Sequence, residues 1–140
     1  MSRPTARTKA RRAALDLLFE AEQRGVNAVD LLEQRIAEPS GDIPPREHTD
    51  TLVRGVVSRW HPINEALTTY SQGWPLERMP AVDRALLRVA TFEVLYLDDV
   101  PDGVAISEAV ALATELSTDE SPAFINGLLS RIADVKATLV

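Results

Sequence analysis

The first residues of the chain carry a cluster of positive charge. Residues 1–12 hold five basic side chains and no acidic one: Arg3, Arg7, Lys9, Arg11 and Arg12. We call residues 1–12 the basic arm. Guanidinium and ammonium groups bind anionic oxygens, and arginine-rich helices and arms bind RNA through its phosphates. The arm therefore predicts an anionic, RNA-like ligand; a short solvated tail without a ligand is the alternative.

The arm leads into a helix that must position it. Gly25 can end this helix as a C-cap, and from about Arg7 its apolar residues recur at helical spacing: Ala10, Ala13, Ala14, Leu17, Leu18 and Ala21. Several cations then lie in the first turns, where each opposes the helix macrodipole at a cost of about a few tenths of a kcal/mol. An anionic partner would offset that cost.

The rest of the chain is acidic. The net charge of all 140 residues is −6, whereas residues 13–140 hold ten basic and 21 acidic residues, a net charge of −11. Such a body repels polyanions and leaves the arm to attract them. There is no cysteine, no apolar run of the ~20 residues that a membrane span needs and no signal-peptide pattern, so we expect a cytoplasmic protein with no membrane contact.

Apolar residues at helical spacing also dominate beyond the arm, and no convincing strand pattern occurs. We predict an all-α fold of about seven helices in two small packed bundles, forming one domain over 1–140 with an N-terminal half at about 7–72 and a C-terminal half at about 78–138. The predicted helix ends are Asn27 and Ser121 as N-caps, Pro45 in a first turn, Pro80 at a helix start, a break at His61-Pro62, and a start near Val104.

Residues for catalysis are missing from the pattern. His48 and His61 are far apart and form no metal-ligand pair, so each is expected on the surface or in a loop. No phosphate-binding glycine loop or nucleophile motif is present, and the acidic pairs Asp98-Asp99 and Asp119-Glu120 fall in predicted loops. We predict a protein that is not an enzyme and has no cofactor and no metal.

The arm contains no aromatic residue, so selectivity for a base sequence would have to come from the body. The candidates for stacking or amide contacts are Phe19, Tyr96, Phe124 and Asn126. Phe124 and Tyr96 fit equally well as core residues.

Several segments in fixed order carry a resemblance. They are RRAALDLLF at 11–19, VDRALLRVA at 82–90, EVL at 93–95, VP at 100–101, VAISEAV at 104–110 and FINGLL at 124–129. Together they resemble the NusB family of bacterial transcription antitermination factors over nearly the whole chain, least from about Glu38 to Gly73. Ser107 stands where the family usually has asparagine, and Phe19 replaces a common tyrosine.

This resemblance implies two perpendicular three-helix bundles plus an extra helix. It implies binding of boxA leader RNA with NusE, a small-subunit ribosomal protein, and action with RNA polymerase and other Nus factors to read through terminators, notably in ribosomal RNA operons. Some relatives form homodimers that hide the arm. The alternative is a protein-interaction scaffold or homodimer that meets RNA only through its partner.

The resemblance also assigns residues. It places RNA contacts at Arg7, Lys9, Arg11 and Arg12, with Arg3 a looser contributor, and near Glu120 and Phe124. Phe19 and Asp83 match positions on the side that faces NusE. For Asp83 the residues alone allow another role, a local ion pair with Arg84 or Arg88, and Glu93 could pair with the same two arginines.

Overall fold

A computed structural model describes residues 5–38 and 45–140, and in these ranges the chain is helical with no strand. This confirms the predicted all-α class. The helices are α1 (Ala6–Arg24), α2 (Ala28–Ala37), α3 (Glu47–Ser58), α4 (Trp60–Tyr70), the 3-10 helix η1 (Leu76–Arg78), α5 (Ala81–Tyr96), α6 (Asp102–Leu116) and α7 (Ser121–Leu139). None of them has the length and apolar character needed to cross a membrane.

Two predicted helix ends are confirmed. Gly25 ends α1 in the left-handed region, with a φ of 66°, and its backbone N–H donates to the carbonyls of the last turn. Asn27 caps α2, because its side-chain oxygen accepts a hydrogen bond from the Val29 N–H at 2.8 Å. Thr5 caps α1 in the same way through the Thr8 N–H at 3.0 Å.

The helix starts predicted from prolines are shifted. α3 begins at Glu47, so Pro45 lies before the helix and not in its first turn. The break predicted at His61-Pro62 falls earlier, at Arg59, because α4 begins at Trp60 and Pro62 lies in its first turn, where a helix needs no N–H donor. α6 begins at Asp102, two residues before the predicted start near Val104.

The prediction of Ser121 as an N-cap is wrong. Glu120 occupies the cap position, and Ser121 is already helical. The Ser121 hydroxyl donates to Asp83 instead, at 2.8 Å. A tertiary acceptor thus takes the hydroxyl that the local pattern assigned to the backbone.

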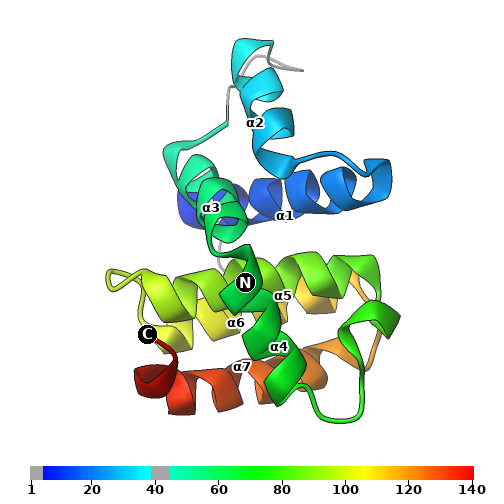
Figure 1. Cartoon of the computed structure of the whole chain (residues 1–140), viewed down its shortest axis with the longest axis vertical. Coiled ribbons are helices and arrows are strands. Elements are labelled where there is room, and N and C mark those ends of the chain that lie inside the picture. The colour runs from blue at the N-terminus through cyan, green and yellow to red at the C-terminus, as the bar shows by residue number, and fades with distance from the viewer. Residues whose placement is uncertain (1–4, 39–44) are drawn as a thin grey trace.

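The helices form two groups that share one interior. α1, α2 and α3 pack together, and α4, α5, α6 and α7 form the second group, as Figure 1 shows. The sequence predicted the boundary of the halves near residues 71–80, whereas α4 packs on α5 and α7, so the chain passes between the groups at Arg59.

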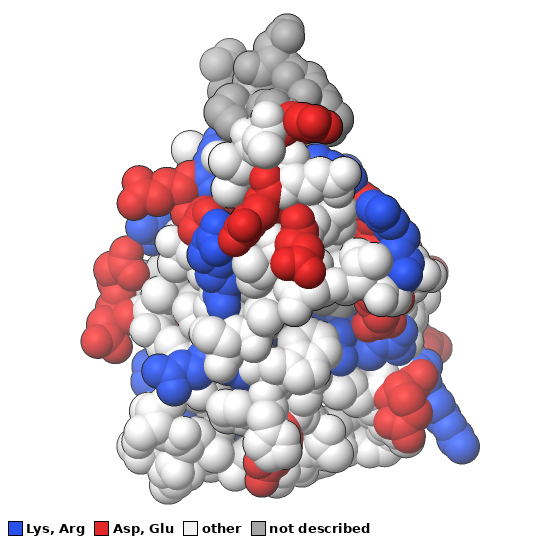
Figure 2. Space-filling view, turned by 45° about the horizontal axis from the view of Figure 1, so that its top comes forward, with Lys and Arg blue, Asp and Glu red and all other residues white. Residues whose placement is uncertain are grey.

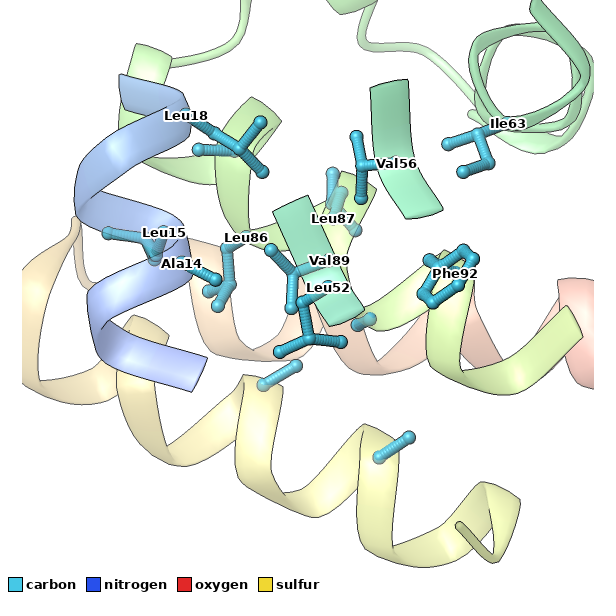
Figure 3. Close-up of a cluster of buried hydrophobic side chains, with 14 of the residues drawn as sticks. Ala14, Leu15, Leu18, Leu52, Val56, Ile63, Leu86, Leu87, Val89 and Phe92 are labelled. Carbon is cyan, nitrogen blue, oxygen red and sulfur yellow. The ribbon is translucent and has the colours of Figure 1, made fainter. Parts of the chain in front are cut away.

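Helix α5 lies between the two groups and contacts both. Every residue from Ala85 to Leu95 is buried, because α1 and α3 cover one side and α6 and α7 the other. Figure 3 shows this interior, with Leu18 of α1, Val56 of α3 and Leu87 of α5 in one apolar cluster. The C-terminal end of α5 and the loop after it lie against the first turns of α1, through the pairs of Arg11 with Glu93 and of Arg7 with Asp99.

Candidate nucleic-acid interface at the basic arm

The first turns of α1 lie against α6 and the loop that precedes it. The Arg7 guanidinium donates to Asp99 Oδ2 at 3.0 Å, and Arg12 Nη1 donates to Glu115 Oε1 at 2.6 Å. Thr8 Oγ1 donates to Glu108 Oε1 at 2.5 Å between these two ion pairs. About half of the Arg7 and Arg12 side-chain surface stays exposed, at 47% and 48%. The structure therefore places both arginines at the surface, each beside a carboxylate.

Arg11 has a different environment from its neighbours. Its side chain is only 5% exposed and forms a bidentate pair with Glu93, with Nε to Oε1 at 2.8 Å and Nη2 to Oε2 at 3.0 Å. Its Nη1 donates to Glu108 at 2.9 Å. The sequence predicted an RNA contact for Arg11, but the structure turns its guanidinium inward, where it ties α1 to α5 and α6.

His48 completes this buried network. Its Nε2–H donates to Glu93 Oε2 at 3.1 Å, and its side chain is 11% exposed. The expectation of a surface or loop position for His48 is wrong, because it lies in α3 with its ring turned inward. The predicted pairing of Glu93 with Arg84 or Arg88 is wrong as well. His61 is 90% exposed, as expected.

The network controls the acidity of Glu93. Burial alone would raise the pKa of the Glu93 carboxyl, but hydrogen bonds from His48 and Arg11 together lower that pKa below the ordinary value of a glutamate. The carboxylate is thus held charged by its two donors. At neutral pH the charged Glu93 carboxylate therefore holds Arg11, and with it the start of α1, against α5.

Lys9 is exposed, and the ion pairs found in residues 5–38 and 45–140 do not include it. Arg3 lies outside the described residues. The cations that the first two turns of α1 present at the surface are therefore Arg7, Lys9 and Arg12.

A second candidate region adjoins the arm through α6. Glu115 lies near the C-terminal end of α6, and Glu120 is exposed where the following loop meets α7. Phe124, in the first turns of α7, is half-buried and packs edge to face on Trp74, with ring centroids 4.9 Å apart. Phe124 thus combines a packed side with an accessible one. Asn126 is exposed on the same helix.

Asp83 is fully buried and faces away from the surface. Its Oδ1 accepts from the Ser117 hydroxyl at 2.5 Å and its Oδ2 from Ser121 at 2.8 Å. It has no pair with Arg84 or Arg88 in the described chain, so that alternative is wrong; both arginines donate to Glu22. The Asp83 carboxyl therefore holds the loop between α6 and α7 rather than presenting itself to a partner.

The other aromatic candidates also pack on the core. Phe19 is half-buried against it. The ring centroid of Tyr96 lies 5.7 Å from that of Phe92. The guanidinium carbon Cζ of Arg59 lies over the Tyr96 ring, 4.8 Å from its centroid. No group of three or more possible metal ligands occurs in the part of the chain that the structure describes.

A comparison with models of protein families identifies the family with this fold and site. The model of the NusB family matches residues 8–134. The chain belongs to the NusB family. The match covers α1 from Thr8 onward and all of α5 and α6, whereas Arg7 lies just before it. It confirms the resemblance found in the sequence.

Individual relatives agree with this membership. The chain is 60% identical to the transcription antitermination protein NusB of Kineococcus radiotolerans, over 96% of this chain and 97% of that protein. The structure of T. maritima NusB superposes with a TM-score of 0.81 at 33% identity, covering 94% of this chain and 93% of that one. A structure of the antitermination factors NusB and NusE with double-stranded RNA contains the same fold, with a TM-score of 0.78 at 24% identity and coverage of 92% and 96%.

Membership in the NusB family establishes transcription antitermination as the role of this chain. It also confirms the prediction that the protein is not an enzyme. The buried network around Arg11 and the surface cations around it thus belong to an antitermination factor.

Proposed function

We propose that this NusB-family protein binds boxA leader RNA together with NusE, in the cytoplasm. The complex would join RNA polymerase and other Nus factors and favour reading through terminators, notably in ribosomal RNA operons. The observation that carries the proposal is the outward placement of Arg7, Lys9 and Arg12 on the first turns of α1 in a fold of this family. A relative of the same fold has been solved with NusE and RNA, which supports the choice of partners.

The residues of the arm have two different roles, phosphate contact and positioning of the helix. Arg7, Lys9 and Arg12 contact RNA phosphates, with Arg3 as a further contributor from outside the described residues. Arg11 positions the helix: to reach a phosphate it would have to leave two carboxylates, and breaking a buried pair costs about 3–5 kcal/mol. Its role is therefore to orient its neighbours.

Selectivity for the RNA sequence would come from the start of α7. Phe124 offers a ring face for stacking on an unpaired base, and Glu120 lies beside it at the exposed helix start. Stacking on an aromatic ring contributes about 1–3 kcal/mol per base. This region lies next to the arm along α6, so one strand of RNA could meet both.

NusE would bind an acidic surface of the body. Residues 13–140 carry a net charge of −11, which complements a basic ribosomal protein. Phe19 is half-buried and contributes apolar surface at that side, whereas Asp83 would affect partner binding only through the loop that it holds.

One observation favours a second function. Arg7 and Arg12 are already paired with carboxylates of their own chain, as expected for a scaffold or homodimer that meets RNA only through its partner. In that case the arm would contribute little to RNA affinity, and partner binding would remain.

The two functions are separated by removing the exposed cations of the arm. Labelled boxA-type RNA and a scrambled RNA are titrated with the protein, alone and with NusE, at several salt concentrations. We expect R7A/K9A/R12A to bind boxA RNA at least tenfold more weakly and with a shallower salt dependence, because phosphate contacts are lost. NusE binding should be unchanged.

The control variant R24A/R54A/R78A removes the same number of positive charges from exposed positions outside the arm. It should keep most of the RNA affinity. Equal losses in both variants, or no RNA binding by the wild type even with NusE, would contradict the proposal and favour the scaffold.

A further inference from the structure

The exposed cations of the arm meet carboxylates at the distances at which they would meet phosphates. Asp99 lies 3.0 Å from Arg7, and Glu115 lies 2.6 Å from Arg12. Both carboxylates come from elements far along the chain, the loop before α6 and the last turns of α6. A charge-assisted hydrogen bond from arginine to a carboxylate has the same donors and the same geometry as one to a phosphate.

We propose that Asp99 and Glu115 compete with RNA phosphates for Arg7 and Arg12, so that the arm is self-neutralised until RNA displaces them. This inference rests on the proposed function, in which the same arginines bind RNA. It assigns a role in RNA affinity to two acidic residues that do not contact the RNA.

Exposure makes this competition reversible. The side chains of Asp99 and Glu115 are 64% and 56% exposed, so water and salt screen both pairs, and such pairs are easily broken. The hydrogen bond from Arg7 lowers the pKa of the Asp99 carboxyl, which keeps this competitor charged. The Arg11 pair is buried and bidentate, and it stays closed when the outer pairs open.

Exposed arginines pair with carboxylates of their own chain outside the arm as well, as Arg24 does with Glu20 and Arg54 with Glu33. On the face shown in Figure 2, basic and acidic side chains lie beside one another, and neither kind forms a continuous area. Lys9 is the exception within the described part of the arm, because it has no carboxylate at ion-pair distance there. A polyanion approaching residues 5–12 would therefore meet one cation without a carboxylate partner, Lys9, and two that must first be released, Arg7 and Arg12.

The salt dependence of binding should report this release. A cation that contacts a phosphate of single-stranded RNA contributes about −0.7 to the slope of log affinity against log salt, through ion release. When Arg7 leaves Asp99, the freed carboxylate gathers a cation from solution and offsets that gain. The wild type should thus show a shallower slope than its number of phosphate contacts implies.

The competition also favours the correct RNA. An RNA that offers only phosphates must displace both carboxylates, whereas an RNA held also through bases or through NusE has other interactions that offset this cost. Asp99 and Glu115 would thereby suppress binding to RNA of unrelated sequence.

The test compares D99N/E115Q with the wild type and with the control E33Q/E65Q. Glu33 and Glu65 are exposed carboxylates of α2 and α4, paired with Arg54 and His61, so the control loses the same charge away from the arm. We expect D99N/E115Q to bind scrambled RNA about tenfold more tightly than the control, and its slope to become steeper by about 1.4, which is ~0.7 for each freed arginine. Thermal melting should be unchanged, because the pairs are exposed.

A second background makes the result specific. In R7A/R12A the same two substitutions should no longer change the slope, since their target cations are absent. Equal slopes for D99N/E115Q and E33Q/E65Q, with RNA bound by all variants, would overturn the inference and leave the proposed function intact. If no variant binds RNA even with NusE, the proposed function and the further inference both fail. If D99N/E115Q is the one variant that binds RNA without NusE, the result supports both of them.

Discussion

Arg11 and Arg12 are adjacent in the sequence but have opposite environments. The helix rotates by about 100° per residue, so one points into the interior and the other across α6. Arg11 is 5% exposed and Arg12 48% exposed. The charge of the arm therefore overstates the number of cations available to an anionic ligand, because the Arg11 guanidinium is paired inside the fold.

Glu93 should make the stability of the protein depend on acid. Its pKa is lower in the folded chain than in the unfolded chain, so its contribution is present above the unfolded pKa of about 4.3 and is lost as the pH falls through the folded pKa. We expect E93Q to lower the free energy of unfolding by about 2–4 kcal/mol at pH 7, since Arg11 loses a buried charge partner. Urea denaturation measures this difference.

The difference between wild type and E93Q should then narrow between pH 5 and pH 3, because protonated glutamate resembles glutamine. Other carboxylates with lowered pKa, such as Glu22, titrate in both proteins and cancel in the comparison. A constant gap over this range would show that the Glu93 charge does not stabilise the fold.

At the residue scale the sequence shows which side chains are basic, but it does not show which of them point into the interior and which point to solvent. The partner of Arg11 lies 82 positions away, and those of Asp83 lie 34 and 38 positions away. Local spacing favours nearer partners, Arg84 or Arg88, for the carboxylates of Asp83 and Glu93. It likewise favours a backbone capping role for the Ser121 hydroxyl.

At the element scale the helical spacing was a sufficient guide. The apolar period predicted about seven helices, and residues 5–38 and 45–140 contain seven α-helices. Gly25 and Asn27 gave two helix ends because their roles depend only on the neighbouring backbone. The shifted starts were at prolines, which are tolerated both before a helix and in its first turn. The burial of α5 on several sides could not be read from its spacing, because Arg88, Thr91 and Glu93 interrupt the apolar residues and are nevertheless buried.

The crossing of α3 over α5 depends on Gly55. A Cβ atom at this position would overlap the ring of Phe92, which is buried in the core. We expect G55A to lower the free energy of unfolding by about 1–3 kcal/mol through overpacking, although alanine favours a helix over glycine by about 1 kcal/mol. Chemical denaturation tests this expectation.

Gly103 is the matched control, because a Cβ atom there meets no other atom within 4 Å and the residue lies in the first turn of α6. G103A should be neutral or slightly stabilising. Equal effects of the two substitutions would mean that the close approach of α3 and α5 does not require glycine.

At the scale of the whole molecule, composition predicted an acidic body with a basic arm, and the resemblance predicted the family. The group to which α4 belongs could not be read from the sequence. The one-residue junction at Arg59 looks like a break within one half, yet it is where the chain passes to the second group. A short amphipathic helix packs on whichever apolar surface the other helices leave uncovered. That surface depends on how all the other helices are arranged, so local sequence does not reveal it.

Because α5 supplies core residues to both groups of helices, neither group has a complete interior of its own. Loss of either group would expose α5, so unfolding should be cooperative, a single all-or-none transition. Far-ultraviolet circular dichroism follows all helices, while the fluorescence of Trp74, recorded in a W60F variant, reports on the second group, because its ring packs on Phe124 of α7. We expect the two melting curves to coincide. Separate midpoints would mean that the two groups unfold independently. The first turns of α1, which are paired with Glu93 of α5, would then lose their position when either group unfolds.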